Sequence, residues 1–261
     1  MYTYWTMFVI KLKEYFMYRL NFVLWRFRAV LSTLITVYLW LAVFDAHTSF
    51  GTYSKMQMLS YILYTGLMST FIASSRTSQL AGEIQSGDLM NLLLKPLAIF
   101  RTYAVYDLVD KAANGIFGIV EFVLIVFFLR IPLVPAQFSF LFVYFALCGM
   151  IISFFINLML SFLGFWSNET WAPRFLFMML VSFVSGTYFP LDLLPPLVFR
   201  ILLLTPFPYM FYLPGKILMN GAQSPYIVQQ VIMALLWTGG IYGTATVMWK
   251  KGLHDFSFWG K

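Results

Sequence analysis

Charged side chains are scarce in this sequence of 261 residues, where Asp, Glu, Lys and Arg together make up 10% of the chain. A soluble globular domain carries about 25% charged residues, so this chain has too few to cover a surface that faces water. That scarcity excludes a soluble enzyme, a secreted disulfide-bonded domain and a disordered chain. Hydrophobic residues make up 61% and aromatic residues 20%, and the mean hydropathy is +0.80. The composition therefore predicts a membrane protein.

Residue patterns for metal binding and catalysis are absent as well. Cys148 is the single cysteine, which excludes a disulfide framework and a thiolate metal site. The two histidines, His47 and His254, are too few for a zinc site. No Walker A loop, H-E-x-x-H motif or G-x-S-x-G motif occurs. We therefore expect no catalytic residue, metal site or cofactor on this chain, and any ATP would have to bind to another chain.

Six apolar stretches are long enough to cross a membrane, since a helix needs about 20 apolar residues to do so. We place the spans at residues 21–44 or 29–44, 57–75, 103–129, 137–165, 171–188 and 226–249. The predicted fold is a single all-α integral membrane domain over residues 1–261, in which residues 21–188 hold the first five spans.

The N-terminal residues 1–20 carry too much charge for a span, because Lys11, Lys13 and Glu14 interrupt the apolar residues. The apolar residues recur at helical spacing, at Trp5, Phe8, Val9, Leu12, Phe16 and Leu20. This pattern is typical of a helix that lies in the membrane interface with its apolar face down. The alternative is an extension of the first span into water.

A proline-rich stretch separates the fifth and sixth spans. It holds six of the 11 prolines, at Pro190, Pro195, Pro196, Pro206, Pro208 and Pro214, and a continuous helix cannot run through them. Irregular backbone at membrane depth survives only against protein or a cavity. We therefore predict two short re-entrant helices in residues 190–222. The alternative is a seventh, kinked span, which would put Lys250 and Lys251 outside.

Basic residues are distributed unequally between the two sides of this topology. Of the 17 Lys and Arg residues, all but Lys55, Arg130, Arg200 and Lys216 fall on the side of the two chain ends. Because basic residues collect on the cytoplasmic side of a membrane, both termini are predicted to be cytoplasmic. The formal net charge of +7 follows from this bias, so we predict no nucleic-acid partner.

The loop between the second and third spans reads GEIQSGDLMNLLLKPLAIFRTY. We expect Ala81 and Gly82 to break the preceding helix, residues 83–88 to form a polar turn, and residues 89–97 to return to the membrane surface and end at Pro96. Such a turn can project from the membrane and dock into a groove on a soluble partner. A solvated turn without a partner explains the same residues equally well.

Within this loop, the string EIQSGDLMNLLLKPL resembles the coupling-helix segment of ABC-2 type transporter permeases, whose bacterial branch has the pattern E-I-x-x-G-x-L-x-x-L-L-x-K-P. The resemblance extends to the interfacial helix, the six spans, the cytoplasmic termini and the re-entrant helices before the last span. The residues of the proline-rich stretch that are similar to the family are Pro195, Pro206, Phe207, Tyr209, Pro214 and Gly221. Together these features cover nearly the whole chain.

The resemblance implies a membrane-spanning subunit of an exporter in the bacterial plasma membrane. It also implies three kinds of partner: a separate ABC ATP-binding subunit that holds ATP and Mg²⁺, a second permease chain that is identical or homologous, and membrane lipids. The main contacts to the ATP-binding subunit would come from Glu83, Ile84, Gln85, Ser86, Gly87, Asp88 and Leu89. A lesser contact would come from the second cytoplasmic loop, at Ser167, Asn168, Glu169 and Thr170.

Polar residues also recur along the third span. Asp107, Lys111, Asn114, Gly118 and Glu121 are three or four positions apart and therefore share one helix face. Asp107 and Lys111 can pair, whereas Glu121 has no partner on its own helix. A charge at this depth has to face protein or water. Glu121 and Asn114 are therefore candidates either for a transport pathway or for hydrogen bonding to a neighbouring helix.

The fourth span carries Gly149, Ser153, Asn157 and Ser161 at four-residue intervals. A row of small residues lets helices approach closely, so packing is the default interpretation. Lining a cavity, with Asn157 as a pathway residue, is the alternative.

Two other classes of function stay open. A membrane-embedded enzyme acting on lipid-linked substrates would use the acidic residues Asp107, Asp110 and Glu121. A secondary transporter driven by protons would carry them through Glu121. Neither explains the polar turn at residues 83–88.

Overall fold

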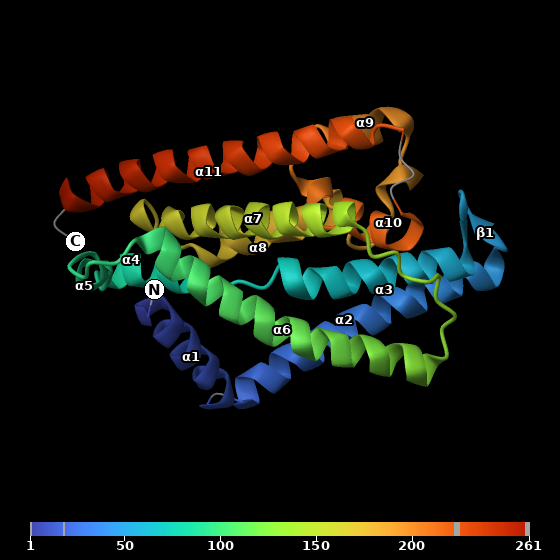
Figure 1. Ribbon diagram of the computed structural model, residues 1–261, viewed down its shortest axis with the longest axis horizontal. Coiled ribbons are helices and arrows are strands. Elements are labelled where there is room, and N and C mark those ends of the chain that lie inside the picture. The colour runs from blue at the N-terminus through green and yellow to red at the C-terminus, as the bar shows by residue number, and fades with distance from the viewer. Residues whose placement is uncertain (1, 18, 222–224, 259–261) are drawn as a thin grey trace.

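Long helices run along the longest axis of the molecule (Figure 1). The computed structural model describes residues 2–17, 19–221 and 225–258. The helices are α1 (Tyr2–Met17), α2 (Arg19–Ala46), α3 (Lys55–Ile72), α4 (Ser78–Ser86), α5 (Leu89–Leu93), α6 (Ile99–Leu129), α7 (Phe140–Phe162), α8 (Trp171–Val184), α9 (Pro196–Leu203), α10 (Tyr212–Asn220) and α11 (Ile227–Phe258). One antiparallel hairpin joins β1 (Ser49–Phe50) to β2 (Tyr53–Ser54). Apart from this hairpin and short 3-10 turns, the described chain is all-α, as predicted from the apolar stretches.

Four of these helices contain stretches long and apolar enough to cross a membrane. They are Phe22–Ala46 in α2, Ile99–Leu129 in α6, Phe140–Phe165 in α7 with the turn that follows it, and Ile227–Phe256 in α11. They coincide with the first, third, fourth and sixth predicted spans. The last helix continues beyond the predicted end at residue 249, because Lys250 and Lys251 are good helix formers and no proline follows them.

The second and fifth predicted spans correspond to α3 and α8. α8 is apolar but has 14 residues, a length of about 21 Å. α3 has 18 residues and packs against α2, α6, α7 and α10, with the side chains of Tyr61 and Leu63 almost fully buried. Because protein encloses much of α3, it can carry polar residues such as Thr65, whose Oγ1 donates to the Tyr61 carbonyl oxygen at 2.8 Å.

The break between α3 and α4 differs from the prediction. Ala81 and Gly82 lie inside α4, and the chain leaves the helix earlier, at residues 73–77. Hydroxyl groups compete for the backbone there: Ser74 Oγ donates to the Thr70 carbonyl oxygen at 3.0 Å, and Ser75 Oγ accepts from the Thr77 amide at 3.3 Å. The expectation that Ala81 and Gly82 break the helix was therefore wrong, since serines end it instead.

α1 turns sharply away from the direction of α2, so it is not a straight extension of the first span (Figure 1). It packs against α6, where Lys11 Nζ lies 4.9 Å from the centre of the Tyr106 ring. The side chain of Phe16, part of the predicted apolar face, lies outside the described residues. The position of α1 in the membrane interface stays a prediction.

The proline-rich stretch forms short helices rather than one continuous span. α9 begins at Pro196 and α10 ends at Asn220, and neither exceeds nine residues, or about 14 Å. Pro196 occupies the first turn of α9, where its missing amide hydrogen costs nothing. The two helices differ in burial: no residue of α9 is buried, whereas most of α10 is enclosed.

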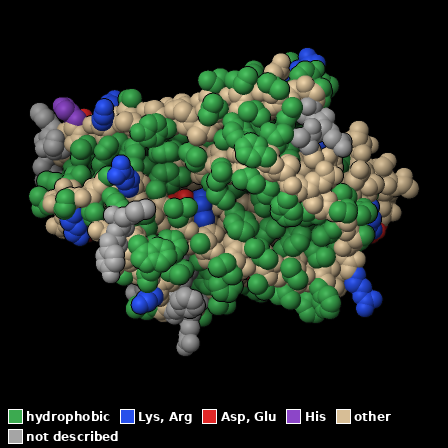
Figure 2. All heavy atoms as spheres, viewed as in Figure 1, with side chains coloured by type: hydrophobic (Ala, Val, Ile, Leu, Met, Phe, Trp, Pro, Cys, Tyr) green, Lys and Arg blue, Asp and Glu red, His purple; other side chains and the backbone are tan. Residues whose placement is uncertain are grey.

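The two ends of the molecule are built from different segments. The beginning of α1, the end of α11 and the α4–α5 segment lie at one end, and the hairpin, α9 and α10 lie toward the other (Figure 1). Figure 2 shows hydrophobic side chains over the middle of the visible face, with Lys and Arg mostly toward the ends. This distribution suits a molecule whose middle faces lipid.

Candidate functional site

The α4–α5 segment is fastened to the helix bundle by apolar side chains. Leu80 and Leu89 are fully buried and Ile84 is 2% exposed, in a cluster that includes Leu158 and Phe162 of α7. Because Ile84 and Leu89 point into this cluster, they hold the segment in place. Motion of the segment would therefore be passed directly to α7.

The exposed part of the segment is a tight polar turn. Gly87 has φ +83°, in the left-handed region that favours glycine, and so reverses the chain between α4 and α5. Ser86 Oγ donates to Asp88 Oδ2 at 2.7 Å and accepts from the Asp88 amide at 3.3 Å. Gln85, Ser86 and Asp88 are exposed. The turn therefore presents polar side chains on a preformed backbone.

Glu83 is tied to the transmembrane part. Its carboxylate accepts a hydrogen bond of 2.5 Å from Tyr103 Oη, at the beginning of α6. Tyr103 itself is fully buried. Sequence reasoning missed this contact, because 20 positions separate the two residues and no pattern links them. The bond connects the exposed segment to α6 as well as to α7.

The second predicted contact segment lies directly beside the first. Gln85 Nε2 donates to the carbonyl oxygens of Ser167 and Asn168, at 3.2 and 3.0 Å. Glu169 Oε1 accepts from the Trp171 amide at 3.0 Å and thereby caps the start of α8. Ser167, Asn168 and Glu169 are exposed, and Thr170 is half-buried. The structure thus brings residues 83–89 and 167–170 onto one surface, which we call the end surface.

Trp166 extends the end surface to the last helix. Its Nε1 donates to Asp255 Oδ2 of α11 at 2.8 Å. A cavity of about 190 Å³ lies between Gln85, Trp166, Asn168 and Phe256. Neither Trp166 nor Asp255 is marked by any sequence pattern. The end surface therefore joins α4, the α7–α8 connection and α11.

The polar face of α6 makes ion pairs near the end surface. Asp107 Oδ2 and Lys111 Nζ are 2.7 Å apart, both residues are 4% exposed, and the predicted pair is confirmed. Lys111 Nζ also donates to the Ser74 carbonyl oxygen at 2.8 Å. Arg76 reaches Glu14 of α1 at 3.1 Å and Asp110 of α6 at 3.3 Å. These contacts connect α1, α6 and the α3–α4 break.

Glu121 pairs with a residue of another helix. Arg26 Nε of α2 donates to Glu121 Oε1 at 2.7 Å, and Arg26 Nη2 makes a second short bond to Oε2. Arg26 Nη1 also donates to Asn114 Oδ1 at 3.2 Å. The neighbouring helix thus supplies the partner that α6 lacks. Breaking a buried pair of this kind costs about 3–5 kcal/mol, because one charge stays buried alone.

The small-residue row of α7 packs closely against its neighbours. A Cβ on Gly149 would lie 3.0 Å from the carbonyl oxygens of Tyr209 and Met210. Asn157 is 4% exposed, and its Nδ2 donates to the Ser153 carbonyl oxygen at 3.0 Å. Arg174 of α8 donates through Nη2 to the Asn157 carbonyl oxygen at 2.7 Å. The packing interpretation of this row is therefore supported by direct contacts.

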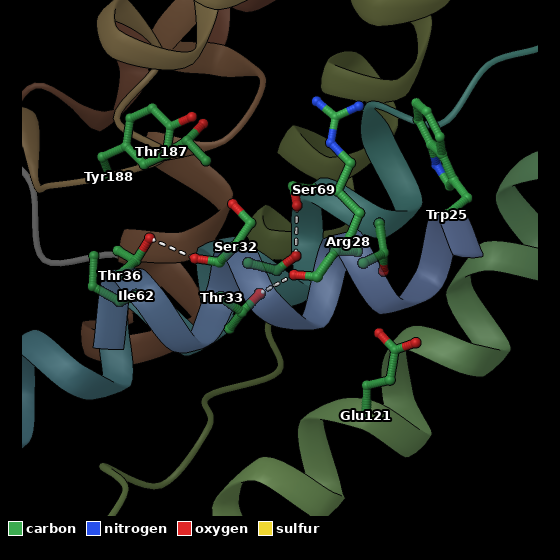
Figure 3. Close-up of a pocket in the computed structure, with 13 residues that line it drawn as sticks. Trp25, Arg28, Ser32, Thr33, Thr36, Ile62, Ser69, Glu121, Thr187 and Tyr188 are labelled. Atoms are coloured by element: carbon green, nitrogen blue, oxygen red, sulfur yellow. Dashed lines mark hydrogen bonds between the residues drawn. The ribbon is translucent and has the colours of Figure 1, made fainter. Parts of the chain in front are cut away.

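Two hollows adjoin these polar groups. One of about 600 Å³ is lined by Glu14, Arg76, Asp110, Asn114, Asn157 and Arg174, among others. The other, of about 270 Å³, is drawn in Figure 3, where Ser32, Thr36 and Ser69 face it and Glu121 approaches from α6. The hydroxyl of Thr36 donates to its own helix, to the Ser32 carbonyl oxygen at 2.9 Å. Asn114, Asn157 and Glu121 thus adjoin space as well as packing partners.

In the part of the chain that the structure describes, no group of three or more His, Cys, Asp or Glu residues could hold a metal ion. Asp107, Asp110 and Glu121, the acidic residues considered for an enzyme, each lie against a different basic residue rather than against one another. The arrangement suits mechanical connection between helices better than acid–base chemistry.

A comparison with models of protein families gives a match over most of the chain. A family model described as "ABC-2 family transporter protein" covers residues 30–260. A search of curated proteins finds no match. The matched range includes every residue of the end surface.

Proposed function

Because the chain belongs to the family of ABC-2 transporter proteins, a family of non-catalytic membrane components, we propose that it is the permease subunit of an exporter driven by a separate ATPase that docks on the end surface. One observation carries this proposal. Gln85 bonds to the carbonyl oxygens of Ser167 and Asn168, so the exposed residues of both segments implied for ATPase contact lie on one surface.

The proposed topology has six spans. Four of them are α2, α6, α7 and α11. The inner helix α3 is the second span, and α8 with the residues up to 188 is the fifth. α9 and α10 are the re-entrant pair. Both chain ends then lie on the cytoplasmic side with the end surface, and α1 lies in the interface. Figure 1 shows the beginning of α1 and the end of α11 toward the same end of the molecule, which supports this arrangement.

The proposed mechanism is mechanical. ATP binding brings the ATPase subunits together and pushes on the exposed turn at Gln85, Ser86 and Asp88. Ile84 and Leu89 pass the push to α7, and the Glu83–Tyr103 bond passes it to α6. The helix bundle then has two states whose balance is set by the contacts that the ATPase makes in each.

The remaining partners follow from the same proposal. Six spans make half of a translocation unit, so a second permease chain, identical or homologous, completes it in the bacterial plasma membrane. ATP and Mg²⁺ belong to the ATPase. A proton-driven mechanism through Glu121 has less support, because both oxygens of that carboxylate already accept hydrogen bonds from Arg26.

Co-purification tests the proposal. The chain is tagged in its native host, extracted in mild detergent, and compared with the double variant Gln85→Arg/Asp88→Arg. Asp45→Arg is the matched control, since Asp45 is an exposed carboxylate at the opposite end. We expect a P-loop ATPase with the wild type and with Asp45→Arg but not with the double variant.

Two outcomes would contradict the proposal. One is a folded wild-type chain that brings down no ATPase under several extraction conditions, which removes the partner. The other is an ATPase that accompanies the double variant as well as it accompanies the wild type, which moves the docking site elsewhere.

A further inference from the structure

A second cavity, far from the end surface, lies between α9 and the beginning of α11. Its volume is about 660 Å³, within the range of small-molecule sites. Trp237 Nε1 of α11 donates to the Leu204 carbonyl oxygen at 3.0 Å and so joins α11 to the end of α9. Figure 1 shows α9 next to the start of α11. The cavity therefore lies between two helices that this hydrogen bond joins at one point.

The wall of this cavity is largely apolar and faces outward. Phe199, Leu203 and Met233 line it, and its floor is Tyr209, whose Oη donates to the Leu203 carbonyl oxygen at 2.7 Å. No residue of α9 is buried, and Leu204 is 63% exposed. An apolar helix with no buried residue requires an apolar neighbour.

Among the described residues, two polar groups of the cavity have no hydrogen-bonding or ion-pair partner for a key atom. Gln230 is 7% exposed, and its Oε1 has no hydrogen-bond donor among the described residues. A buried carbonyl oxygen without a donor costs free energy, so a ligand that supplies one is favoured. Arg200 is exposed at the rim and has no carboxylate within ion-pair distance in the described chain. The site therefore calls for an anion and a hydrogen-bond donor together.

The polar and apolar groups are ordered along the helices. Gln229 and Gln230 lie in the first turn of α11, Met233 lies one turn further, and Trp237 about 10 Å beyond Gln230. α9 follows the same order, with Arg200 one turn before Leu204. One end of the cavity thus suits a polar head and the other an apolar chain.

We propose that this cavity binds one anionic phospholipid whose headgroup carries a hydroxyl, of which phosphatidylglycerol is the simplest. Arg200 binds the phosphate, Gln230 Oε1 accepts from the headgroup hydroxyl, and an acyl chain lies against Leu203, Leu204 and Met233. The lipid fills the cavity and holds α9 to α11. The site goes beyond the proposed function, because it involves neither the end surface nor the ATPase.

Photo-crosslinking tests this site directly. The purified chain is placed in nanodiscs that contain phosphatidylglycerol with a diazirine on its acyl chain, and crosslinked peptides are mapped by mass spectrometry. Phosphatidylcholine with the same chains serves as the comparison lipid. We expect crosslinks at residues 203–204 and 233, at least about tenfold more from phosphatidylglycerol. Both lipids carry a phosphate, but phosphatidylcholine offsets its charge with a quaternary ammonium and has no headgroup hydroxyl for Gln230.

Variants separate the site from general lipid contact. Arg200→Gln and Gln230→Leu should each lower these crosslinks, and Arg200→Lys should retain most of them. Arg130→Gln is the matched control, because Arg130 is an exposed cation at the same end of the molecule. Phosphatidylglycerol should also raise the thermal unfolding midpoint of the wild type but not of Arg200→Gln, because a ligand stabilises only the state that binds it.

Three results would overturn the proposal. The first is equal labelling by both lipids, and the second is labelling that Arg200→Gln and Gln230→Leu leave unchanged while each variant elutes as the wild type does. The third is a disulfide between two copies of Leu204→Cys without any lipid crosslink nearby, since a second copy of the chain would then fill the cavity.

Discussion

Two ion pairs show how differently the inside and the end of this molecule hold charge. Inside the bundle, the side chains of Arg26 and Glu121 are 9% and 19% exposed. Beside the hairpin, the side chains of Lys55 and Asp45 are 48% and 79% exposed, with their charged atoms 3.7 Å apart. Water already solvates the second pair, so the contact adds little, whereas the first pair has lost its water and depends on the partner. Exposure rather than charge therefore decides which pairs hold the fold.

The largest effect should come from Arg26→Met. It leaves Glu121 buried without its partner and removes a donor from Asn114, so the free energy of unfolding should fall by about 3–5 kcal/mol. Thermal unfolding in detergent measures the loss. Arg26→Met/Glu121→Leu should recover most of it, because no charge then stays buried. An Arg26→Met variant as stable as the wild type would mean that lipid or water solvates Glu121.

Tyr53→Phe, in the hairpin at the end of the molecule opposite the end surface, should lower the free energy of unfolding by less. Tyr53 Oη donates to Asp192 at 2.8 Å, and Lys216 Nζ contacts the same carboxylate at 2.6 Å. The variant keeps the ring but loses the bond that the hydroxyl donates to Asp192 and the bond that it accepts from Lys216 Nζ. The free energy of unfolding should therefore fall by about 2 kcal/mol. Lys216 continues to neutralise Asp192, which keeps the loss below that of Arg26→Met.

The same variant predicts a pH dependence. Burial, and then the nearby Asp192 carboxylate, raise the pKa of Tyr53 well above its ordinary value. The folded protein therefore keeps the phenol neutral, while the unfolded chain ionises it above a pH of about 10. The stability that this tyrosine contributes is complete below that pH and is lost as the pH rises. In unfolding curves from pH 8 to 11, the wild type's advantage over Tyr53→Phe should shrink; an advantage that grows would contradict the assignment.

Local contacts were predictable from the sequence and distant ones were not. Asp107 and Lys111 are one helical turn apart, so their pairing follows from helix geometry alone. Arg26 and Glu121 are separated by 95 positions, and the sequence indicates only that Glu121 needs some partner. Two parts of the sequence could also have ended the helix that precedes the polar turn. The glycine at position 82 suggested the break, but the serines at 74 and 75 determine it.

In the candidate site, too, local features were predictable from the sequence and distant contacts were not. The motif at residues 83–89 indicates the end surface, and the resemblance adds residues 167–170. Their juxtaposition depends on how α4 packs against α7, which no local pattern specifies. Trp166 and Asp255 had no signal at all, because an exposed tryptophan and a half-buried carboxylate are common in any chain.

Gln85→Ala tests whether this side chain holds residues 167–170 beside residues 83–89. The free energy of unfolding should fall by about 1 kcal/mol, because the variant removes a neutral side chain that donates to two carbonyl oxygens. The clearer readout is local. Amide hydrogen exchange should accelerate in residues 163–170 and remain unchanged in α10. Ser86→Ala is the control, because Ser86 is equally exposed but bonds only within its own turn. Faster exchange in both variants would mean that the turn, rather than the bridge, orders the second segment.

The smallest effect should come from Lys55→Gln, which breaks the exposed pair that Lys55 makes with Asp45. Surface ion pairs are worth about 0–1 kcal/mol, and a long, well-hydrated lysine 3.7 Å from its partner falls at the low end. The unfolding midpoint in detergent should therefore stay close to that of the wild type, at both low and high salt. Asp45→Asn should behave alike, because either change leaves the other charge in water. A loss comparable to that of Tyr53→Phe would mean that this end is buried in the assembled transporter, and that exposure within a single chain does not describe it.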